Sequence, residues 1–168
     1  KIQMMKQGKY VGGYAPYGYV LSHEAVKFDV TEENSTEESG VTIVAVKLGN
    51  YAQKGIIKIS KTGEVFATVT AADGVYQPVY TGQGLAGATY EIKAAADIYT
   101  PDGTLRCSAG EVVDTVTTGA DDTVESKPLY LGKYEVKEIT APYGMVLNDE
   151  IHAVELVYAG QNIAVTET

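Results

Sequence analysis

The fold of this chain is decided by the stretch Leu129-Tyr-Leu-Gly-Lys-Tyr-Glu-Val-Lys-Glu-Ile-Thr-Ala-Pro-Tyr-Gly144. Polar and apolar side chains alternate from Lys133 to Lys137, which is the period of a β-strand with one buried face. The strand signal ends at Ala-Pro-Tyr-Gly, where proline and glycine favour a turn. We therefore predict a strand here, with one face exposed and the other buried, and a turn directly after it.

Similar signals recur on both sides of this stretch. Short runs rich in β-branched residues and tyrosine are separated by glycine-containing turns such as Pro101-Asp-Gly-Thr104. Only 94–98 resembles a helical turn, and it is too short to be stable alone. The further strands that we expect are 55–61, 88–93, 111–116, 151–157 and 162–166. The pattern predicts an antiparallel all-β fold.

Composition limits the class of protein. Apolar residues make up 45% of the 168 residues and charged residues 21%, which is typical of a globular domain. The net charge of −9 without a basic patch argues against nucleic acid or an anionic membrane as a partner. We find no 18-residue apolar stretch, signal-peptide pattern or wall-sorting signal, so we expect no membrane contact by this segment. The first residue is Lys1, which suggests a fragment of a longer polypeptide.

Residues suited to catalysis or metal binding are few. Cys107 is the only cysteine, and His23 and His152 are the only histidines, so we expect neither a disulfide framework nor a histidine or cysteine metal site. Asp97, Asp121 and Asp122 lie in turn-like contexts where exposed carboxylates are usual. No cofactor, no metal and no catalysis on an external substrate are expected.

An internal repeat indicates how the chain is organised. Ala15-Pro-Tyr-Gly-Tyr-Val-Leu21 recurs as Ala141-Pro-Tyr-Gly-Met-Val-Leu147, and acidic alternating segments, 24–30 and 150–156, follow the two copies. Because the second copy lies late in its domain, the first copy should also lie late in a domain. We therefore predict that 1–53 is the C-terminal part of a preceding sandwich domain and that 54–168 is a second domain. The acidic stretch 32–40 is predicted to be a solvated loop.

Several motifs together resemble a known family. Ile57-Lys-Ile-Ser-Lys61, Gly84-Leu-Ala-Gly-Ala-Thr-Tyr-Glu-Ile92, the Asp102-Gly turn and Leu129–Gly144 occur in the order seen in the collagen-adhesin B-type domain, also called the SpaA-like pilin or prealbumin-like domain. The resemblance covers roughly 55–168. It implies an inverse-immunoglobulin-like β-sandwich on surface proteins and pili of Gram-positive bacteria, often in tandem arrays.

The resemblance also implies a self-formed isopeptide bond between a first-strand lysine and a last-strand asparagine, assisted by a buried glutamate. Side chains two apart share a face of a strand, so Lys61 lies on the apolar side with Ile57 and Ile59. Glu138 lies on the inner face of its strand by the same rule, whereas Glu135 points to solvent. Lys61 and Glu138 are therefore the candidate lysine and assisting acid.

Burial would favour the uncharged forms of both groups, which is what amide formation needs. Two other interpretations remain open at this point. The lysine and glutamate would form a buried ion pair without any reaction, or the strand register would bring both to solvent.

The asparagine is the departure from the family pattern. The last strand that should carry it does not follow Asn162, but 41–50 resembles such a strand and carries Asn50 on one face with Val44, Val46 and Leu48. Asn50 thus resembles the acceptor of the preceding domain. Three arrangements are possible: both domains are incomplete in a fragment, 41–50 completes the sheet of 54–168, or it completes the sheet of a neighbouring molecule.

The resemblance predicts a structural stalk or adhesin module, extracellular and either attached to the cell wall or secreted, with neighbouring domains of the same protein as partners. The alternative is a domain that binds a host protein or glycan through tyrosine-rich loops. The chain has 13 tyrosines, and Tyr76 and Tyr80 in the 62–83 insertion are the candidate binding residues. These tyrosines could instead pack over the sandwich.

Overall fold

The computed structural model describes residues 4–6, 9–11, 14–22, 30–45 and 49–163. Every regular element among them is a β-strand, so the prediction of an all-β fold is confirmed. The chain forms two compact units, one of Lys1–Gln53 with Ala159–Thr168 and the other of Lys54–Tyr158. None of the described residues belongs to a helix of the length and apolarity needed to cross a membrane.

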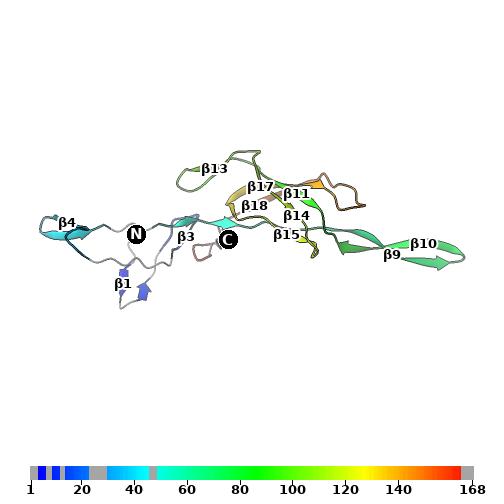
Figure 1. Cartoon of the computed structure of the whole chain (residues 1–168), viewed down its shortest axis with the longest axis horizontal. Helices are drawn as coiled ribbons and strands as arrows, with labels where there is room; N and C mark the ends of the chain where they lie inside the picture. The colour runs from blue at the N-terminus through cyan, green and yellow to red at the C-terminus, as the bar shows by residue number, and fades with distance from the viewer. Residues whose placement is uncertain (1–3, 7–8, 12–13, 23–29, 46–48, 164–168) are drawn as a thin grey trace. The chain divides into compact units, whose positions relative to one another are not determined.

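The second unit holds most of the strands (Figure 1). They are β7 (Lys54–Gly55), β8 (Lys58–Ser60), β9 (Thr62–Ala72), β10 (Val75–Gly84), β11 (Thr89–Ala94), β12 (Ile98–Tyr99), β13 (Leu105–Cys107), β14 (Val112–Thr117), β15 (Thr123–Glu125), β16 (Leu129–Tyr130), β17 (Gly132–Thr140) and β18 (Ile151–Leu156). The predicted Pro101–Thr104 turn joins β12 to β13, with Gly103 at a φ of +80°.

One layer of the sandwich is a four-stranded antiparallel sheet in the order β14-β11-β17-β18. Along β11, Tyr90, Ile92 and Ala94 are buried while the residues between them are half-exposed. Tyr134 and Val136 repeat this alternation on β17. Alternate residues of both central strands therefore form one apolar face.

The opposite layer consists of short pairs, β8 with β15 and β7 with β16. Its contribution to the core is Ile57 and Leu129, which belong to the same buried cluster as Ile92, Tyr134 and Val136. The two layers pack at Gly55, where an added Cβ would lie 3.2 Å from the side chain of Leu156 on β18. This arrangement is the predicted antiparallel β-sandwich.

The predicted insertion 62–83 is a long two-stranded hairpin. β9 and β10 pair from Thr62↔Gly84 to Ala72↔Val75, and the two-residue turn Asp73-Gly74 has positive φ at both positions. Such primed turns match the twist of a hairpin. Nearly all residues of the hairpin are exposed, and Figure 1 shows it extending from the sandwich of its unit.

The first unit contains shorter pairs. Its strands are β1 (Met4–Lys6), β2 (Lys9–Val11), β3 (Tyr19–Val20), β4 (Ser35–Glu38), β5 (Val41–Val44) and β6 (Tyr51–Ala52). They form the antiparallel pairs β1–β2, β3–β6 and β4–β5. The first copy of the repeat motif thus contributes β3, which pairs with the segment just before Lys54.

The prediction that 32–40 is a loop was wrong. β4 and β5 form a hairpin there, closed by Ser39-Gly40 with φ of 52° and 75°. The acidic composition of this stretch favoured a loop, but the Ser39-Gly40 turn allows the exposed polar residues on its two sides to pair as strands. The predicted strand 24–30 lies almost entirely outside the described residues. Asn162 lies in a turn, and the rest of the predicted strand 162–166 is described only at Ile163.

Candidate functional site

The structure brings Lys61 and Glu138 together inside the second unit. Lys61 follows β8, Glu138 lies on β17, and the lysine Nζ is 3.0 Å from the glutamate Oε1. The side chain of Glu138 is 2% exposed and that of Lys61 is 15% exposed. The inward directions that side-chain parity predicted for both residues are therefore confirmed. Lys58 and Glu125, in contrast, form an exposed pair at 3.7 Å.

The two oxygens of Glu138 differ in their partners. Oε2 accepts a 2.8 Å hydrogen bond from the backbone N–H of Asn148. Oε1 is buried and, among the described residues, receives no hydrogen bond of good geometry, although the Lys61 ammonium is close enough for an ion pair. Buried polar atoms are nearly always satisfied, so Oε1 has room for one more donor.

The surroundings of the pair are apolar. Tyr90 lies opposite Glu138 in the β11–β17 register and is 7% exposed. Burial, followed by the nearby Glu138 charge, raises the pKa of Tyr90 above its ordinary value. Ile57 and Val136 are in the same buried cluster, and Ile59 packs against it. A low-dielectric setting of this kind strengthens electrostatic interactions and excludes water.

Asn50 is not part of this arrangement. It lies in the first unit, is exposed, and accepts a 3.4 Å hydrogen bond from the backbone N–H of Ser22. Only Val41–Val44 of the predicted 41–50 strand forms β5, and it pairs with β4 of its own unit. Asn50 is outside any strand, and the predicted positions of Val46 and Leu48 lie outside the described residues.

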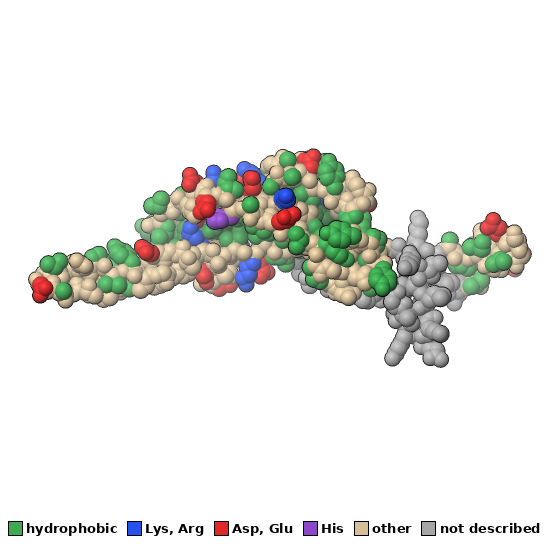
Figure 2. Space-filling model, turned by 180° about the vertical axis from the view of Figure 1, so that it is seen from behind, with side chains coloured by type: hydrophobic (Ala, Val, Ile, Leu, Met, Phe, Trp, Pro, Cys, Tyr) green, Lys and Arg blue, Asp and Glu red, His purple; other side chains and the backbone are tan. Residues whose placement is uncertain are grey.

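Tyr76 and Tyr80 both lie on β10 of the hairpin. Their exposed fractions are 76% and 55%, so the alternative that they pack over the sandwich is excluded for these two. Tyr80 makes an edge-to-face contact with Phe66 of β9, with ring centroids 6.3 Å apart. In Figure 2 the hairpin carries apolar side chains and an acidic tip without any blue side chain, in line with Glu64 and Asp73 as its only charges.

The carboxylates that could have suggested a metal site stabilise turns. Asp97 accepts a hydrogen bond from the N–H of Ala109. Asp121 accepts one from the Thr123 hydroxyl, which lowers the pKa of its carboxyl. No cluster of three or more metal-ligating side chains occurs in the ranges that the structure describes. His152 is exposed on β18, and His23 lies outside those ranges.

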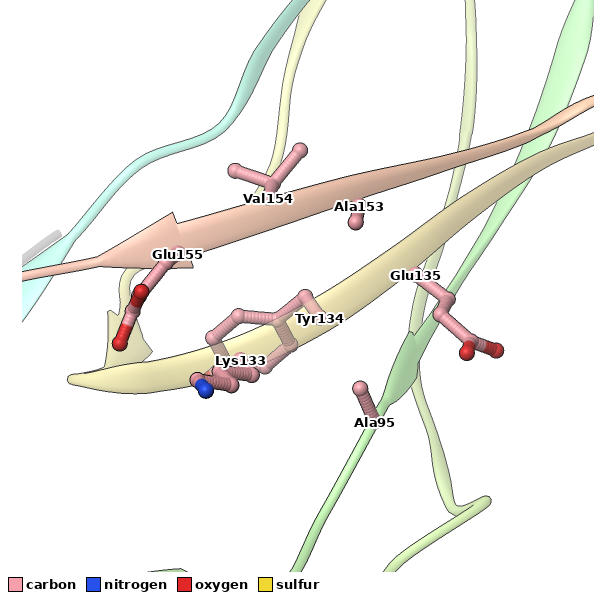
Figure 3. Close-up of a pocket in the computed structure, with 7 residues that line it drawn as sticks. All are labelled: Ala95, Lys133, Tyr134, Glu135, Ala153, Val154 and Glu155. Atoms are coloured by element: carbon pink, nitrogen blue, oxygen red, sulfur yellow. The ribbon is translucent and has the colours of Figure 1, made fainter.

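A shallow cavity of about 360 Å³ lies along β17 and β18 (Figure 3). Its charged lining residues are Lys133, Glu135 and Glu155. They alternate along β17 and β18 with the more buried residues Tyr134 and Val154. Tyr134 also lines it, but its hydroxyl donates to the carbonyl of Tyr130. Neither Lys61 nor Glu138 lines this cavity.

The comparison with protein families assigns the chain. The family model described as the SpaA prealbumin-like fold domain matches residues 79–168, more than half of the chain. This chain belongs to the SpaA prealbumin-like family. The match to the SpaA family model includes Glu138 and begins inside β10, so Lys61 and β9 precede it.

Three solved structures are similar to this SpaA-family chain. The T6 backbone pilin of serotype M6 Streptococcus pyogenes matches 65% of this chain and 17% of its own, at 22% identity and a TM-score of 0.37. The Bacillus anthracis TIE protein matches 92% and 22%, at 26% identity and a TM-score of 0.47. The pilus 2b backbone protein of group B streptococcus matches 79% and 45%, at 19% identity and a TM-score of 0.40.

The SpaA-family chain spans less than half the length of each of these structures. The comparison with curated proteins found no match.

Sequence reasoning missed two contacts in this SpaA-family chain. Nothing in the pattern indicated that the Asn148 backbone would reach Glu138, because the contact depends on how the turn after β17 closes. Gln53 was also missed. It is 2% exposed, donates to the carbonyl of Gly160 and accepts from the N–H of Ala159, both at 2.8 Å. The Ala15–Leu21 repeat motif was the only sequence signal that the residues around Gln53 belong to a folded unit.

Proposed function

We propose that the chain is a structural stalk module of a Gram-positive cell-surface or pilus protein, and that its second unit is built to form a Lys–Asn isopeptide bond with help from Glu138. The observation that carries this proposal is the buried Lys61–Glu138 pair at 3.0 Å in a domain of the SpaA family. Oε1 of Glu138 receives no hydrogen bond of good geometry from the described residues, so this oxygen has the capacity to bond a further group beside Lys61.

The chemistry follows from the two groups. Lys61 acts as a neutral amine, and its nitrogen attacks the side-chain carbonyl carbon of an asparagine while protonated Glu138 donates a hydrogen bond to the carbonyl oxygen. The new C–N bond forms as the bond to the amide nitrogen breaks. Glu138 passes the proton lost by the lysine to that leaving nitrogen, and ammonia departs.

One edge of β8 is unpaired among the described residues, and the strand that brings the asparagine would pair there. The N–H of Lys61 bonds to the carbonyl of Asp122, and the carbonyl of Ile57 accepts from Ser126, so these alternate residues face β15. The backbone groups of Lys58 and Ser60 therefore point to the other edge of β8. β8 pairs only with β15 among the described residues, and an unpaired edge accepts a further strand.

The internal repeat supplies a candidate for that strand. Ala15 and Ala141 are equivalent positions 126 residues apart, so Thr168 corresponds to Thr42. The counterpart of Asn50 would then come eight residues after Thr168. A strand with the sequence of 43–50 is accordingly the acceptor that we propose for Lys61, whether it comes from the same polypeptide or from a neighbouring molecule.

A cross-link of this kind suits a stalk. It would limit the unfolded ensemble as a disulfide does, by about 2–4 kcal/mol, without being open to reduction. We propose an extracellular location, attached to the cell wall or secreted, and neighbouring domains of the same protein as partners. No catalysis on an external substrate is proposed, because the reaction consumes the protein's own side chains.

The test is the intact mass of a lengthened chain in which a second copy of residues 43–58 follows Thr168. This addition continues the repeat in register and supplies a copy of Asn50. We expect a mass lower by about 17 Da, the ammonia lost on condensation. Replacement of Lys61 by Arg, of Glu138 by Ala, or of the added asparagine by Ala should each restore the full mass. An unchanged mass in the lengthened parent protein would refute the cross-link.

A second candidate function is recognition of a host protein or glycan by the β9–β10 hairpin. The observation that favours it is the exposure of Tyr76, Tyr80 and Phe66 on a hairpin that carries only two charges. Exposed tyrosines are common in recognition surfaces because they bury much area at a small entropic cost.

The hairpin can be shortened without a change of register. Removal of 66–72 and 75–80 joins Val65 and Thr81, which are already paired, through the existing Asp73-Gly74 turn. This variant should keep the unfolding midpoint of the parent chain and lose any binding in a glycan array or host-matrix adhesion assay. Equal binding by the shortened and parent chains would exclude the hairpin as the recognition site.

A further inference from the structure

The two copies of the repeat motif, Ala15–Leu21 and Ala141–Leu147, have the same local structure. In the first copy, the N–H of Tyr19 donates to the carbonyl of Pro16 at 3.1 Å, and in the second the N–H of Met145 donates to Pro142 at 3.0 Å. The motif glycine has a φ of +82° in the first copy and +79° in the second. Both copies therefore form the same turn.

Their surroundings differ. Val20 is 9% exposed, whereas Val146, at the same position of the motif, is 91% exposed. Leu147 is 46% exposed, whereas the motif tyrosine is exposed in both copies, as Tyr17 and as Tyr143. Because the motif and its turn are shared, the difference points to the segments that lie beside each copy.

The first copy is covered by a strand. β6 pairs with β3 through Tyr19↔Ala52 and Val20↔Tyr51. The pairing extends by one more bond, because the N–H of Gln53 donates to the carbonyl of Gly18 at 2.8 Å. A three-residue segment, Tyr51-Ala-Gln53, thus pairs with the strand that carries the buried valine of the first copy.

The 159–161 segment completes the cover. The carbonyl of Gln161 accepts from the N–H of Leu21, and its side-chain oxygen accepts from the N–H of Ala15, both at 2.8 Å. Gln53 holds this segment through its bonds to Ala159 and Gly160. The glutamine of the covering strand therefore also secures the second part of the cover.

From this comparison we infer that the second copy is a docking site for a strand of the Tyr51-Ala-Gln53 type, which runs from the last strand of one sandwich domain into the next domain. The inference rests on the proposed function as a module of a larger surface protein. No strand pairs with Met145-Val146 among the described residues, so the backbone there is open to such a partner.

The repeat register supports this occupant. With equivalent positions 126 apart, the counterparts of Tyr51 and Gln53 would follow Thr168. Val146 and Leu147 are apolar and exposed, as expected of residues that a strand will cover. One segment would then serve two purposes in order: its asparagine would meet Lys61, and its Tyr-Ala-Gln would cover the second copy.

Hydrogen exchange measures this docking directly. The protein is the chain lengthened by residues 43–58, with the added asparagine replaced by Ala so that no cross-link can form. We expect exchange in a peptide covering 143–148 to slow by about tenfold or more relative to the unlengthened chain. A matched control, in which the added Tyr-Ala-Gln is replaced by Ser-Gly-Ser, should exchange at the unlengthened rate.

The outcomes separate docking from cross-linking. Slow exchange in the asparagine-to-alanine protein supports docking even if the unmutated lengthened chain loses no ammonia, a result that would refute only the cross-link. Unchanged exchange in that protein overturns the docking proposal, even if the unmutated chain does lose ammonia. A Val146→Ser variant should remove the protection in the lengthened chain and leave the unlengthened chain unaffected.

Discussion

Replacement of Glu138 by Ala is the most informative perturbation of the second unit. It removes a side chain that is 2% exposed and takes away the partner of Lys61, whose side chain is 15% exposed. It also removes the acceptor of the Asn148 N–H. The lysine is left largely buried without a counter-charge, which is among the costlier changes in a protein interior.

The expected loss can be estimated from these contacts. Breaking a buried ion pair by removal of one partner costs about 3–5 kcal/mol. The Asn148 N–H adds little to this because Asn148 is exposed and water can replace the carboxylate. We therefore expect Glu138→Ala to lower the free energy of unfolding of the second unit by about 4 kcal/mol, a large part of the 5–15 kcal/mol typical of a domain.

Urea unfolding followed by far-UV circular dichroism and tyrosine fluorescence measures this loss, since the chain has no tryptophan. Glu135→Ala is the matched control on the same strand, and it should cost less than about 0.5 kcal/mol because its side chain points away from the core. The double variant Lys61→Met with Glu138→Leu should recover most of the stability, since two apolar residues replace the pair. A loss below about 1 kcal/mol for Glu138→Ala would refute the buried pair.

Three further outcomes are expected. Gln53→Ala should destabilise the first unit by about 1–3 kcal/mol because the N–H of Ala159 and the carbonyl of Gly160 lose their partner, and exchange of the Ala159 amide should rise accordingly. Ile92→Ala should cost about 2–5 kcal/mol in urea unfolding, since Ile92 is fully buried, and a smaller loss would contradict the assigned core. The raised pKa of Tyr90 means that its contribution to stability is complete below pH ~10 and is lost as pH rises through the folded-state value. Tyr90→Phe should therefore reduce the alkaline loss of stability, and an identical pH profile in the variant would contradict the shift.

Side-chain parity was enough to predict the inner faces of the sandwich. The period of two placed Lys61 with Ile57 and Ile59, and placed Glu138 with Tyr134 and Val136, because direction along a strand is a local property. The repeat likewise indicated that 15–21 and 141–147 are equivalent, and the structure gives both the same turn.

Two kinds of feature were harder to predict: a turn masked by the composition around it, and contacts between residues far apart in the sequence. The Ser39-Gly40 turn is a local signal that the acidic composition of 32–40 obscured, so the β4–β5 hairpin was missed. The bonds of Gln53 to Ala159 and Gly160 join residues more than 100 positions apart, and no local period reports such a contact. The hydrogen-bond partner of Asn50 is likewise set by a segment distant in the sequence, the one that contains Ser22.

The most direct test of the account is peptide mapping of the chain lengthened by residues 43–58. Tryptic digestion and tandem mass spectrometry should find a branched peptide in which the side chain of Lys61 is joined to the added copy of Asn50, and this peptide should be absent when Glu138 is replaced by Ala. Recovery of Lys61 and the added asparagine only in separate, unmodified peptides would contradict the central claim.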